Sequence, residues 1–284
     1  MRIGFIGVGL MGGPLARNLI RNGYSVDVFD LSAEAIEKTV SVGESGKKAN
    51  SIDELKSSDV IFTSLPLPQH VTDVMLNDGG LYEKLNANST HVELSTIDAS
   101  TAETLEKEAN KKNISYIQCT LGKTPAHAEK AEEPMFIGGD ERAYEKIKNI
   151  LSSIGIVNYV GPVAASCAVK LISNMIGMTN VAVLAEGMKV GDKAGLDRKK
   201  LLELLADTGA HSFQMDVRGP WIAEEDYKSR FPLDLALKDI RIGLEMSKDW
   251  NLDLQTMESA LKEFMRAHDE GYGQEDCNAV FKVL

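Results

Sequence analysis

Hydrophobic residues follow two different periods within the first thirty positions. A mostly apolar run over residues 2–6 predicts a buried strand, and apolar residues then recur with a helical period over residues 10–22. Gly23 ends the predicted helix, and residues 25–29 predict a second strand. The chain therefore opens with a strand–helix–strand unit, the building block of a parallel sheet.

The same alternation continues as far as residue 160. Helices are predicted over residues 32–42, 98–110 and 140–153 and near 52–55, and strands over 59–65, 91–94, 115–119, 135–138 and 157–160. A polar loop, residues 120–133, separates two of these strands. Alternating strands and helices predict an α/β domain with a mostly parallel, doubly wound sheet and right-handed crossovers.

The pattern changes at Gly161-Pro162. From Val163 onward no convincing strand appears, and residues 163–191 form one long helical segment that is small or apolar on nearly every face. Because a helix that is apolar all round is usually buried all round, we expect it between two domains or at a subunit interface. Further helices are predicted over residues 197–206, 212–218, 233–248 and 253–268, with a turn and a short helix at the end.

The turn between the first strand and the first helix carries the pattern G-x-G-x-x-G at Gly7, Gly9 and Gly12. Gly7 permits a tight turn, Gly9 lets a pyrophosphate approach the backbone, and Gly12 lets helix and strand pack closely. The pyrophosphate would lie on the helix N-terminus, beside Leu10 and Met11, where the helix dipole is positive. The pattern predicts a Rossmann dinucleotide-binding domain; the alternative is a tight glycine turn in another α/β unit.

These patterns divide the chain into two predicted domains. Residues 1–162 would form the NAD-binding Rossmann domain, and residues 163–284 would form an all-α domain for substrate binding and oligomerisation, joined to the first by the long helix.

The acidic residue that ends the second strand bears on the choice of cofactor. Asp30 stands where a carboxylate accepts hydrogen bonds from an adenosine ribose. An NADP site usually offers Arg or Lys just after this position, whereas Leu31 and Ser32 are neutral. Because Asp30 would repel a 2′-phosphate, the sequence favours NAD.

Two later strand ends should join the same cofactor edge. Leu65 and Pro66 end one predicted strand, and Ser95-Thr96 ends the next. Because the carboxyl ends of parallel strands meet at one edge, Leu65, Pro66 and Thr96 are candidate cofactor contacts. Thr96 is also a candidate substrate contact; the alternative for this hydroxyl is a helix cap or a turn.

Composition argues against nucleic-acid binding, a membrane span and a metal site. The net charge of −11 argues against broad nucleic-acid binding, although a pocket can still be locally basic. By composition we expect no apolar run to approach the ~18 residues of a membrane span, and the first residues predict a strand instead of a signal peptide. The three cysteines and five histidines show no metal-ligand spacing, and an odd cysteine count suits a reducing compartment. We therefore expect a cytoplasmic protein without a metal.

Several spaced motifs together resemble the β-hydroxyacid dehydrogenase family, whose best-known member is 3-hydroxyisobutyrate dehydrogenase. The matching stretches are GFIGVGLMG from Gly4, LP from Leu65, ST from Ser95, GPVAASCAVKLISN from Gly161, LDLALKD from Leu233 and GYGQED from Gly271. They span essentially the whole chain in the family's order. The resemblance implies an NAD(H)-dependent oxidoreductase that acts on the CH–OH group of a small 3-hydroxy acid.

The family's catalytic lysine falls on Lys170. Hydride transfer to a carbonyl leaves an oxyanion that must be protonated, and a partly desolvated lysine can have its pKa lowered toward working pH. The alternative is a lysine whose stem carries its charge to solvent. By the same resemblance Asn174 binds substrate and Lys238 lies near the nicotinamide and substrate, unless it is a surface lysine. Asp239 is expected to be structural.

Two departures from the family pattern concern the substrate. Ala164 to Ser166 replace a family G-x-G, which predicts a tighter pocket near Lys170. In the loop after Cys119, Gly122-Lys123-Thr124 replaces the Ser-Gly-Gly that grips the substrate carboxylate in most of the family. This loop resembles that of sulfolactaldehyde reductases, where G-R-T-S directs a cation to the sulfonate. Lys123 can anchor sulfonate, carboxylate or phosphate as a point charge, whereas an arginine would add a bidentate fork; otherwise it is a solvated loop lysine.

The leading hypothesis is an NAD(H)-dependent enzyme that interconverts a small anionic 3-hydroxy acid, or hydroxy sulfonate, and its aldehyde. Gly122, Lys123, Thr124 and Asn174 would surround the substrate, with Lys170 as general acid/base. The alternatives are a 3-hydroxyisobutyrate or glyoxylate/succinic semialdehyde enzyme, an imine reductase, which Lys170 argues against, and a non-catalytic NAD-binding scaffold. The apolar long helix also predicts a homodimer or homotetramer, which sedimentation as a monomer at micromolar concentration would contradict.

Overall fold

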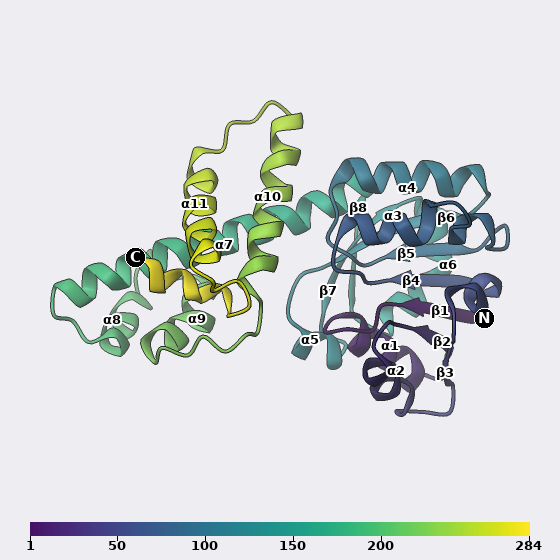
Figure 1. The fold of residues 1–284 in the computed structure, drawn as a ribbon, viewed down its shortest axis with the longest axis horizontal. Helices are drawn as coiled ribbons and strands as arrows, with labels where there is room; N and C mark the ends of the chain where they lie inside the picture. The colour runs from purple at the N-terminus through teal and green to yellow at the C-terminus, as the bar shows by residue number, and fades with distance from the viewer. The chain divides into compact units, whose positions relative to one another are not determined.

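The computed structural model describes all 284 residues and divides into two compact units, Met1–Lys170 and Leu171–Leu284 (Figure 1). Each unit has its own hydrophobic core. The boundary between the units falls inside the longest helix, α7 (Val163–Lys193).

The first unit is built on one eight-stranded sheet in the order β3-β2-β1-β4-β5-β6-β7-β8. The strands are β1 (Arg2–Ile6), β2 (Ser25–Phe29), β3 (Gly46–Lys48), β4 (Val60–Thr63), β5 (Thr90–Glu93), β6 (Ser115–Leu121), β7 (Pro134–Gly139) and β8 (Ile156–Gly161). Every neighbouring pair is parallel except β6 and β7. The predicted doubly wound α/β sheet is therefore confirmed.

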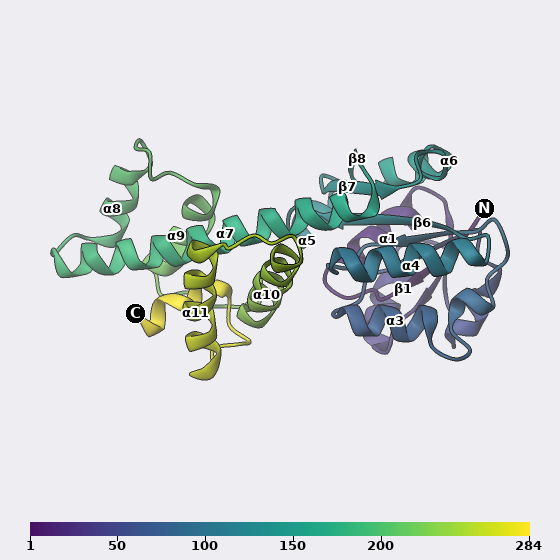
Figure 2. The same ribbon diagram turned by 90° about the horizontal axis from the view of Figure 1, so that it is seen from above.

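Helices cover both faces of this sheet. One face carries α1 (Gly12–Arg21), α2 (Ala33–Val40) and α6 (Glu141–Ser152), and the other carries α3 (Pro68–Leu76) and α4 (Ala99–Lys111) (Figure 2). Short 3-10 helices, η1 (Ile52–Ser57) and η2 (Leu81–Glu83), complete the connections. Phe5 of β1 stacks on Phe62 of β4 with ring centroids 5.4 Å apart, and neither ring is exposed. Strands β1 and β4 are buried on both faces, which explains their apolar runs, whereas β5 buries the polar side chains of His91 and Glu93.

Four elements were not predicted: the helices α3 and α5, the 3-10 helix η2 and the strand β3. The loop over residues 120–133 contains α5 (Pro125–Glu129), and both α5 and α3 have a proline in their first turn. Proline pre-sets the helical φ at this position, so here it starts a helix in addition to ending the preceding segment. The polar three-residue strand β3 lacks an apolar run because it lies at the edge of the sheet.

The second unit is entirely helical, as predicted. After the second part of α7 it comprises α8 (Arg198–Leu205), α9 (Phe213–Ala223), α10 (Leu233–Asp249), α11 (Gln255–Asp269) and the 3-10 helix η3 (Cys277–Val283). Figure 1 shows α10 and α11 side by side, with η3 beneath them. Helix α9 runs beyond the predicted end at Arg218 and includes Pro220.

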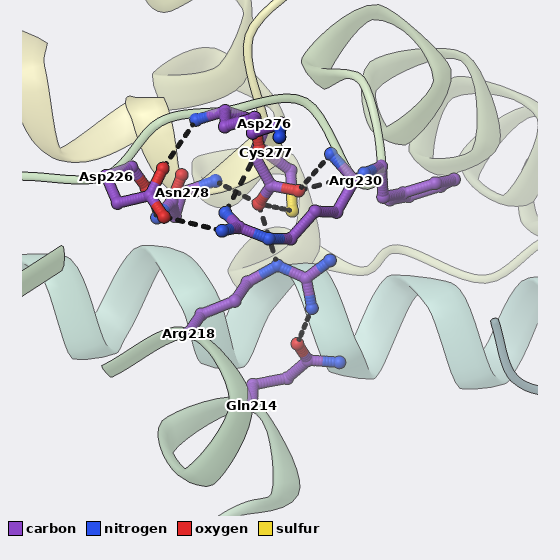
Figure 3. A network of polar contacts seen from close by, with 9 residues as sticks. Gln214, Arg218, Asp226, Arg230, Asp276, Cys277 and Asn278 are labelled. Atoms are coloured by element: carbon purple, nitrogen blue, oxygen red, sulfur yellow. Dashed lines mark hydrogen bonds and ion pairs between the residues drawn. The ribbon is translucent and has the colours of Figure 1, made fainter. Parts of the chain in front are cut away.

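A buried carboxylate holds the terminal segment of the second unit in place (Figure 3). Asp276 is fully buried and accepts hydrogen bonds from the backbone N–H groups of Phe231 (2.8 Å) and Arg230 (3.2 Å). The Nε atom of Arg218 donates to the other carboxylate oxygen at 3.2 Å. A buried charge is tolerated when it is paired and hydrogen-bonded, and Asp276 meets both conditions.

Helix α7 differs from its prediction in two respects. It is not buried all round, because Val183 and Val190 are 58% and 69% exposed while Val181 and Ala185 are fully buried. It is also long and apolar enough to cross a membrane by length and composition, so the expectation that no segment approaches such a span is wrong for this helix. A core helix of a water-soluble protein passes the same test.

Candidate active site

The glycine-rich turn has room for a ligand at one glycine and none at the other two. Gly7 has φ +87°, and an added Cβ would lie 2.3 Å from the carbonyl oxygen of Ser64. At Gly12 an added Cβ would lie 2.0 Å from the carbonyl oxygen of Gly7. At Gly9, by contrast, nothing lies within 4 Å. Backbone geometry therefore requires glycine at Gly7 and Gly12, whereas Gly9 leaves the turn open to solvent.

The N-terminus of α1 is left uncapped by side chains. No side chain accepts a hydrogen bond at its cap residue, Met11, whereas Ser32, Asp98 and Asp140 cap α2, α4 and α6. Leu10, just before it, is 70% exposed. An exposed helix start with uncapped N–H groups is a favourable site for an anion.

Asp30 lies beside this turn and supports it. One carboxylate oxygen accepts the Val8 N–H at 2.7 Å and the other accepts the Ser32 N–H at 2.8 Å. Each carboxylate oxygen has a second lone pair, so the residue can still accept ribose hydroxyls. Leu31, the next residue, is 96% exposed and adds no positive charge.

The first turns of α7 are fixed to the edge strands of the sheet. An added Cβ on Gly138 would lie 2.4 Å from the carbonyl oxygen of Pro162, which shows how closely the helix start approaches β7. One turn later the buried Ser166 hydroxyl donates to the carbonyl oxygen of Phe136 at 2.7 Å. Its backbone carbonyl accepts from the Thr120 hydroxyl at 2.9 Å. Ser166 thus fixes the helix to the sheet, a role that the expectation of a tighter pocket did not anticipate.

This anchoring determines where Lys170 lies. Pro162, at the start of α7, lies against Gly138, and Ser166, one turn later, contacts Phe136, so each turn of the helix passes two residues of β7. One further turn of four residues, about 6 Å, brings α7 level with Pro134. Pro134 faces Gly122 across the sheet, and its carbonyl oxygen accepts the Gly122 N–H at 2.9 Å. Lys170 is half-buried there, at the edge where the parallel strands end, and its charge lowers the pKa of Glu133.

The loop over residues 122–133 begins beside this lysine. The Lys123 N–H donates to Oε1 of the buried Glu133 at 2.5 Å, while the Lys123 side chain is exposed. Thr124, also exposed, contacts His127 through its hydroxyl at 2.8 Å. The Gly122 and Lys123 N–H groups are thus both used within the protein, whereas the Lys123 and Thr124 side chains are open to solvent.

The far end of the loop over residues 122–133 is bound to α1. Arg17 and Arg21 both bind the carboxylate of Glu129, and the Asn18 amide donates to the carbonyl oxygen of Ala128 at 2.7 Å. The hydrogen bond from Arg17, with a further one from Arg21, lowers the pKa of Glu129 to about 2. The helix that follows the glycine turn therefore also sets the position of the loop that carries Lys123.

The remaining predicted residues lie on other strand ends and in the second unit. Leu65 and Thr96 are half-buried at the ends of β4 and β5, and Pro66 is exposed. In the second unit the Asn174 amide donates to the buried Asp239 at 2.5 Å, and the Lys238 ammonium group lies 3.1 Å from the same carboxylate. Asp239 therefore pairs with an amide and a cation, whereas cofactor contact by Lys238 stays a prediction.

Comparison with known proteins covers the whole chain. Residues 2–162 match the NAD-binding domain of 6-phosphogluconate dehydrogenase, and residues 164–284 match the NAD-binding domain of NADP-dependent 3-hydroxyisobutyrate dehydrogenase. The 2-(hydroxymethyl)glutarate dehydrogenase of Eubacterium barkeri is 33% identical over 100% of this chain and 94% of its own length. The chain belongs to the β-hydroxyacid dehydrogenase family. It is accordingly an oxidoreductase that uses a nicotinamide dinucleotide and acts on CH–OH groups.

Two further proteins place this β-hydroxyacid dehydrogenase among its relatives. Glyoxylate/succinic semialdehyde reductase 2 of Arabidopsis thaliana, a chloroplastic protein, is 28% identical over 99% of this chain and 79% of its own length. The crystal structure of 3-hydroxyisobutyrate dehydrogenase from Salmonella typhimurium matches with a TM-score of 0.90 at 23% identity, covering 100% of both chains. The latter likeness shows the fold.

A nicotinamide dinucleotide fits the residues of this dehydrogenase's glycine turn. The open space at Gly9 and the uncapped start of α1 would hold its pyrophosphate, and Asp30 would accept a ribose hydroxyl. When bound, the dinucleotide supplies or accepts the hydride.

Sequence reasoning missed a buried chain of hydrogen bonds beneath the cofactor edge of the dehydrogenase. The Thr63 hydroxyl donates to Oε2 of Glu93 at 2.5 Å and lies 2.7 Å from Nε2 of His91. The Tyr82 hydroxyl lies 2.6 Å from the other ring nitrogen. When Glu93 is ionised, Thr63 gives it its only hydrogen, so His91 then donates to Thr63 through Nε2 and accepts from Tyr82 through Nδ1.

Glu93 also connects the ends of two strands. Its Oε1 accepts the Ser95 N–H at 2.6 Å, and the Ser95 hydroxyl accepts the Leu65 N–H at 2.8 Å. The Glu93 carboxylate thus holds Ser95, and through it the backbone of Leu65, next to the candidate cofactor contact Thr96. Ser95 itself acts in this internal connection. Alternating polar residues in β5 were the only sequence signal for it.

Burial of Glu93 makes a pH-dependent contribution to stability. Burial raises its pKa to about 7, although hydrogen bonds from Ser95 and Thr63 oppose the shift. A carboxyl with a raised folded-state pKa stabilises the fold fully below its ordinary pKa near 4.5, and this contribution is lost as pH rises through about 7. Burial lowers the pKa of His91 to about 3, so its own contribution is lost only on acidification below 6.5.

Replacement of Glu93 by glutamine tests whether the contribution of Glu93 to stability is lost as pH rises. We expect the free energy of unfolding of the native protein to fall relative to Glu93→Gln between pH 5 and pH 7, by on the order of 1 kcal/mol per pH unit. His91 is present in both proteins and cancels in the difference. Urea unfolding at pH 5, 6, 7 and 8 measures the effect; a difference that stays constant across this range would contradict it.

Proposed function

We propose that this dehydrogenase interconverts a small anionic 3-hydroxy acid, or hydroxy sulfonate, and the corresponding aldehyde. The anchoring of Lys170 next to the Gly122-Lys123 segment carries this proposal. It supports a proton-transfer group and an anion-binding cation at one edge of the sheet. The Eubacterium barkeri and Arabidopsis thaliana relatives are named for 2-(hydroxymethyl)glutarate and for glyoxylate and succinic semialdehyde, which all carry carboxylates. These names support an acidic substrate here as well.

In this proposal Lys170 holds the proton that the reaction needs. During reduction its ammonium group donates a hydrogen bond to the aldehyde oxygen and then gives that oxygen a proton as the hydride arrives at carbon. During oxidation the neutral amine removes the alcohol proton. Asn174, one turn further along α7, would orient the same oxygen, and Thr124 and Lys123 would bind the acid group.

Lys123 is proposed to select the anion, in the manner of the sulfolactaldehyde reductase loop. For Lys123→Ala we expect the KM of an anionic aldehyde to rise about 10-fold or more with little change in kcat, because a contact equal in ground and transition states is lost. The assay follows NADH oxidation with sulfolactaldehyde, succinic semialdehyde, glyoxylate and a neutral aldehyde. Lys130→Ala, an exposed lysine of the same loop, is the matched control.

The outcome of this assay separates the alternatives. A preference for sulfolactaldehyde supports the sulfonate assignment, and a preference for succinic semialdehyde or glyoxylate supports the carboxylate alternative. An unchanged KM in Lys123→Ala would refute the anchor. No turnover with any aldehyde acid would favour the non-catalytic scaffold.

The cofactor is proposed to be NAD(H) in preference to NADP(H). We expect kcat/KM for NADH to exceed that for NADPH at least about tenfold, which corresponds to about 1.4 kcal/mol. The reason is that Asp30 repels a 2′-phosphate and that the next two residues, Leu31 and Ser32, carry no positive charge. Leu31→Arg should narrow the ratio, since this exposed position would gain a cation. A native preference for NADPH would overturn the argument from Asp30.

A further inference from the structure

One buried carboxylate oxygen near Lys170 accepts no hydrogen bond from the protein. Glu133 is fully buried just before β7, and its Oε1 accepts the Lys123 N–H at 2.5 Å. Its Oε2 is equally buried and has no hydrogen-bond partner. Leaving such an atom unsatisfied is unfavourable, so a compensating interaction is expected.

The register of the sheet brings this carboxylate to the edge where Lys170 lies. Leu121 pairs with Met135 in the antiparallel β6–β7 ladder, so Lys123 and Glu133 face each other two residues beyond. The anchoring of α7 through Ser166 brings Lys170 to the same level of β7. Three independent elements, the end of β6, the start of β7 and α7, therefore meet around one carboxylate.

The charges around Glu133 agree with this geometry. Burial raises the pKa of the Glu133 carboxyl, whereas the hydrogen bond from the Lys123 N–H, the charge of Lys170 and the nearby Gly122 N–H lower it. The Lys123 side chain lowers it least. The thiol of Cys119 on β6 also lies near Glu133, and burial raises its pKa, so it stays neutral.

We propose that Glu133 is the counter-ion of Lys170: one carboxylate oxygen holds the Lys123 backbone, and the other keeps the Lys170 ammonium group protonated and oriented. Glu133 is then a positioning residue that acts through Lys170. The expected effect of Glu133 on turnover rests on the proposed catalytic role of Lys170, whereas the ion pair between the two residues does not. Together with Lys123, the three side chains carry one net positive charge, which matches a substrate with a single anionic group.

The counter-ion role predicts a shift in the pH dependence of reduction. The reaction needs protonated Lys170, so kcat falls as pH rises through the pKa of this lysine. Glu133→Gln removes the negative charge but retains an oxygen for the Lys123 N–H. We expect the basic limb of the kcat profile to move about one to three pH units lower, the usual effect of losing an adjacent opposite charge.

A measurement without turnover tests the same contact. In protein labelled with 13C at lysine Cε, the Lys170 signal is assigned by its loss in Lys170→Arg and titrated by NMR. Glu133→Gln should lower its midpoint by at least about one unit. Glu132→Gln, the exposed neighbour, is the matched control and should change neither the midpoint nor the pH profile. An unchanged Lys170 midpoint in Glu133→Gln would overturn the proposal.

A reciprocal variant keeps the test decisive if Glu133→Gln does not fold. In Lys170→Met the 13Cδ signal of Glu133 should titrate at higher pH than in the native protein, because the positive charge is lost; an unchanged midpoint would refute the pairing. Retained turnover in Lys170→Ala alongside coupled midpoints would instead reject the catalytic role and leave the ion pair standing.

Discussion

Replacement of Lys170 by alanine is expected to reduce kcat about 10³-fold or more while NADH binding stays nearly intact. General acid–base groups typically contribute about 10²–10⁴-fold, and here the same ammonium group also polarises the carbonyl oxygen. Lys170 lies at the sheet edge because Ser166 fixes the preceding turn of α7, so truncation at Cβ should leave the backbone of the glycine turn unchanged. Steady-state kinetics and NADH fluorescence titration measure the two effects separately.

The control for this variant is Lys193→Ala, an exposed lysine at the end of the same helix. It should keep native kcat. A Lys170→Ala enzyme that retains a tenth of the native rate would remove Lys170 from the catalytic role. A large loss of NADH affinity would show instead that the lysine supports cofactor binding.

Replacement of Asp276 by alanine is expected to destabilise the second unit by about 3–5 kcal/mol, the usual result of removing one partner of a buried ion pair. The change leaves the Arg218 guanidinium without its carboxylate and two backbone N–H groups, of Arg230 and Phe231, without an acceptor. Because Asp276 joins the terminal segment to the residues before α10, the loss should appear as earlier unfolding of the helical unit.

Denaturant unfolding of both proteins, with hydrogen exchange to localise the change, measures this effect. Asp269→Ala, at the exposed end of α11, is the matched control and should change stability by less than about 0.5 kcal/mol. A loss below about 1 kcal/mol in Asp276→Ala would mean that water replaces the carboxylate and that the network contributes little.

Sequence reasoning was most successful where local pattern and backbone sterics decide the structure. The strand–glycine–helix unit was confirmed because Gly7 and Gly12 have no room for a side chain. It failed where the deciding neighbour is remote in sequence. The helix α5 was predicted as a loop because its anchor, the α1 arginines that bind Glu129, lies more than a hundred residues earlier.

Burial was harder to predict than secondary structure. The composition of α7 indicated burial on every face, yet Val183 and Val190 are exposed in the single chain. Composition alone does not specify which elements cover a helix. For the same reason the functions of Glu93 and Glu133 were not predicted. Glu93 is one acidic residue in a strand pattern and Glu133 is one in the predicted loop, and only the folded chain shows that Glu93 bonds Thr63 and that Glu133 faces Lys123.

The sequence by itself determined the α/β and all-helical halves, the glycine turn, the acid at its side and the family to which the chain belongs. These features depend on local period, on backbone sterics and on short motifs in order. Only the tertiary structure decided that Ser166 fixes α7 to the sheet, that Glu93 connects two strand ends, and that Glu133 meets Lys123 from across the sheet. Those contacts arise between segments far apart in the chain, where the antiparallel β6–β7 pairing and the path of α7 set the distances.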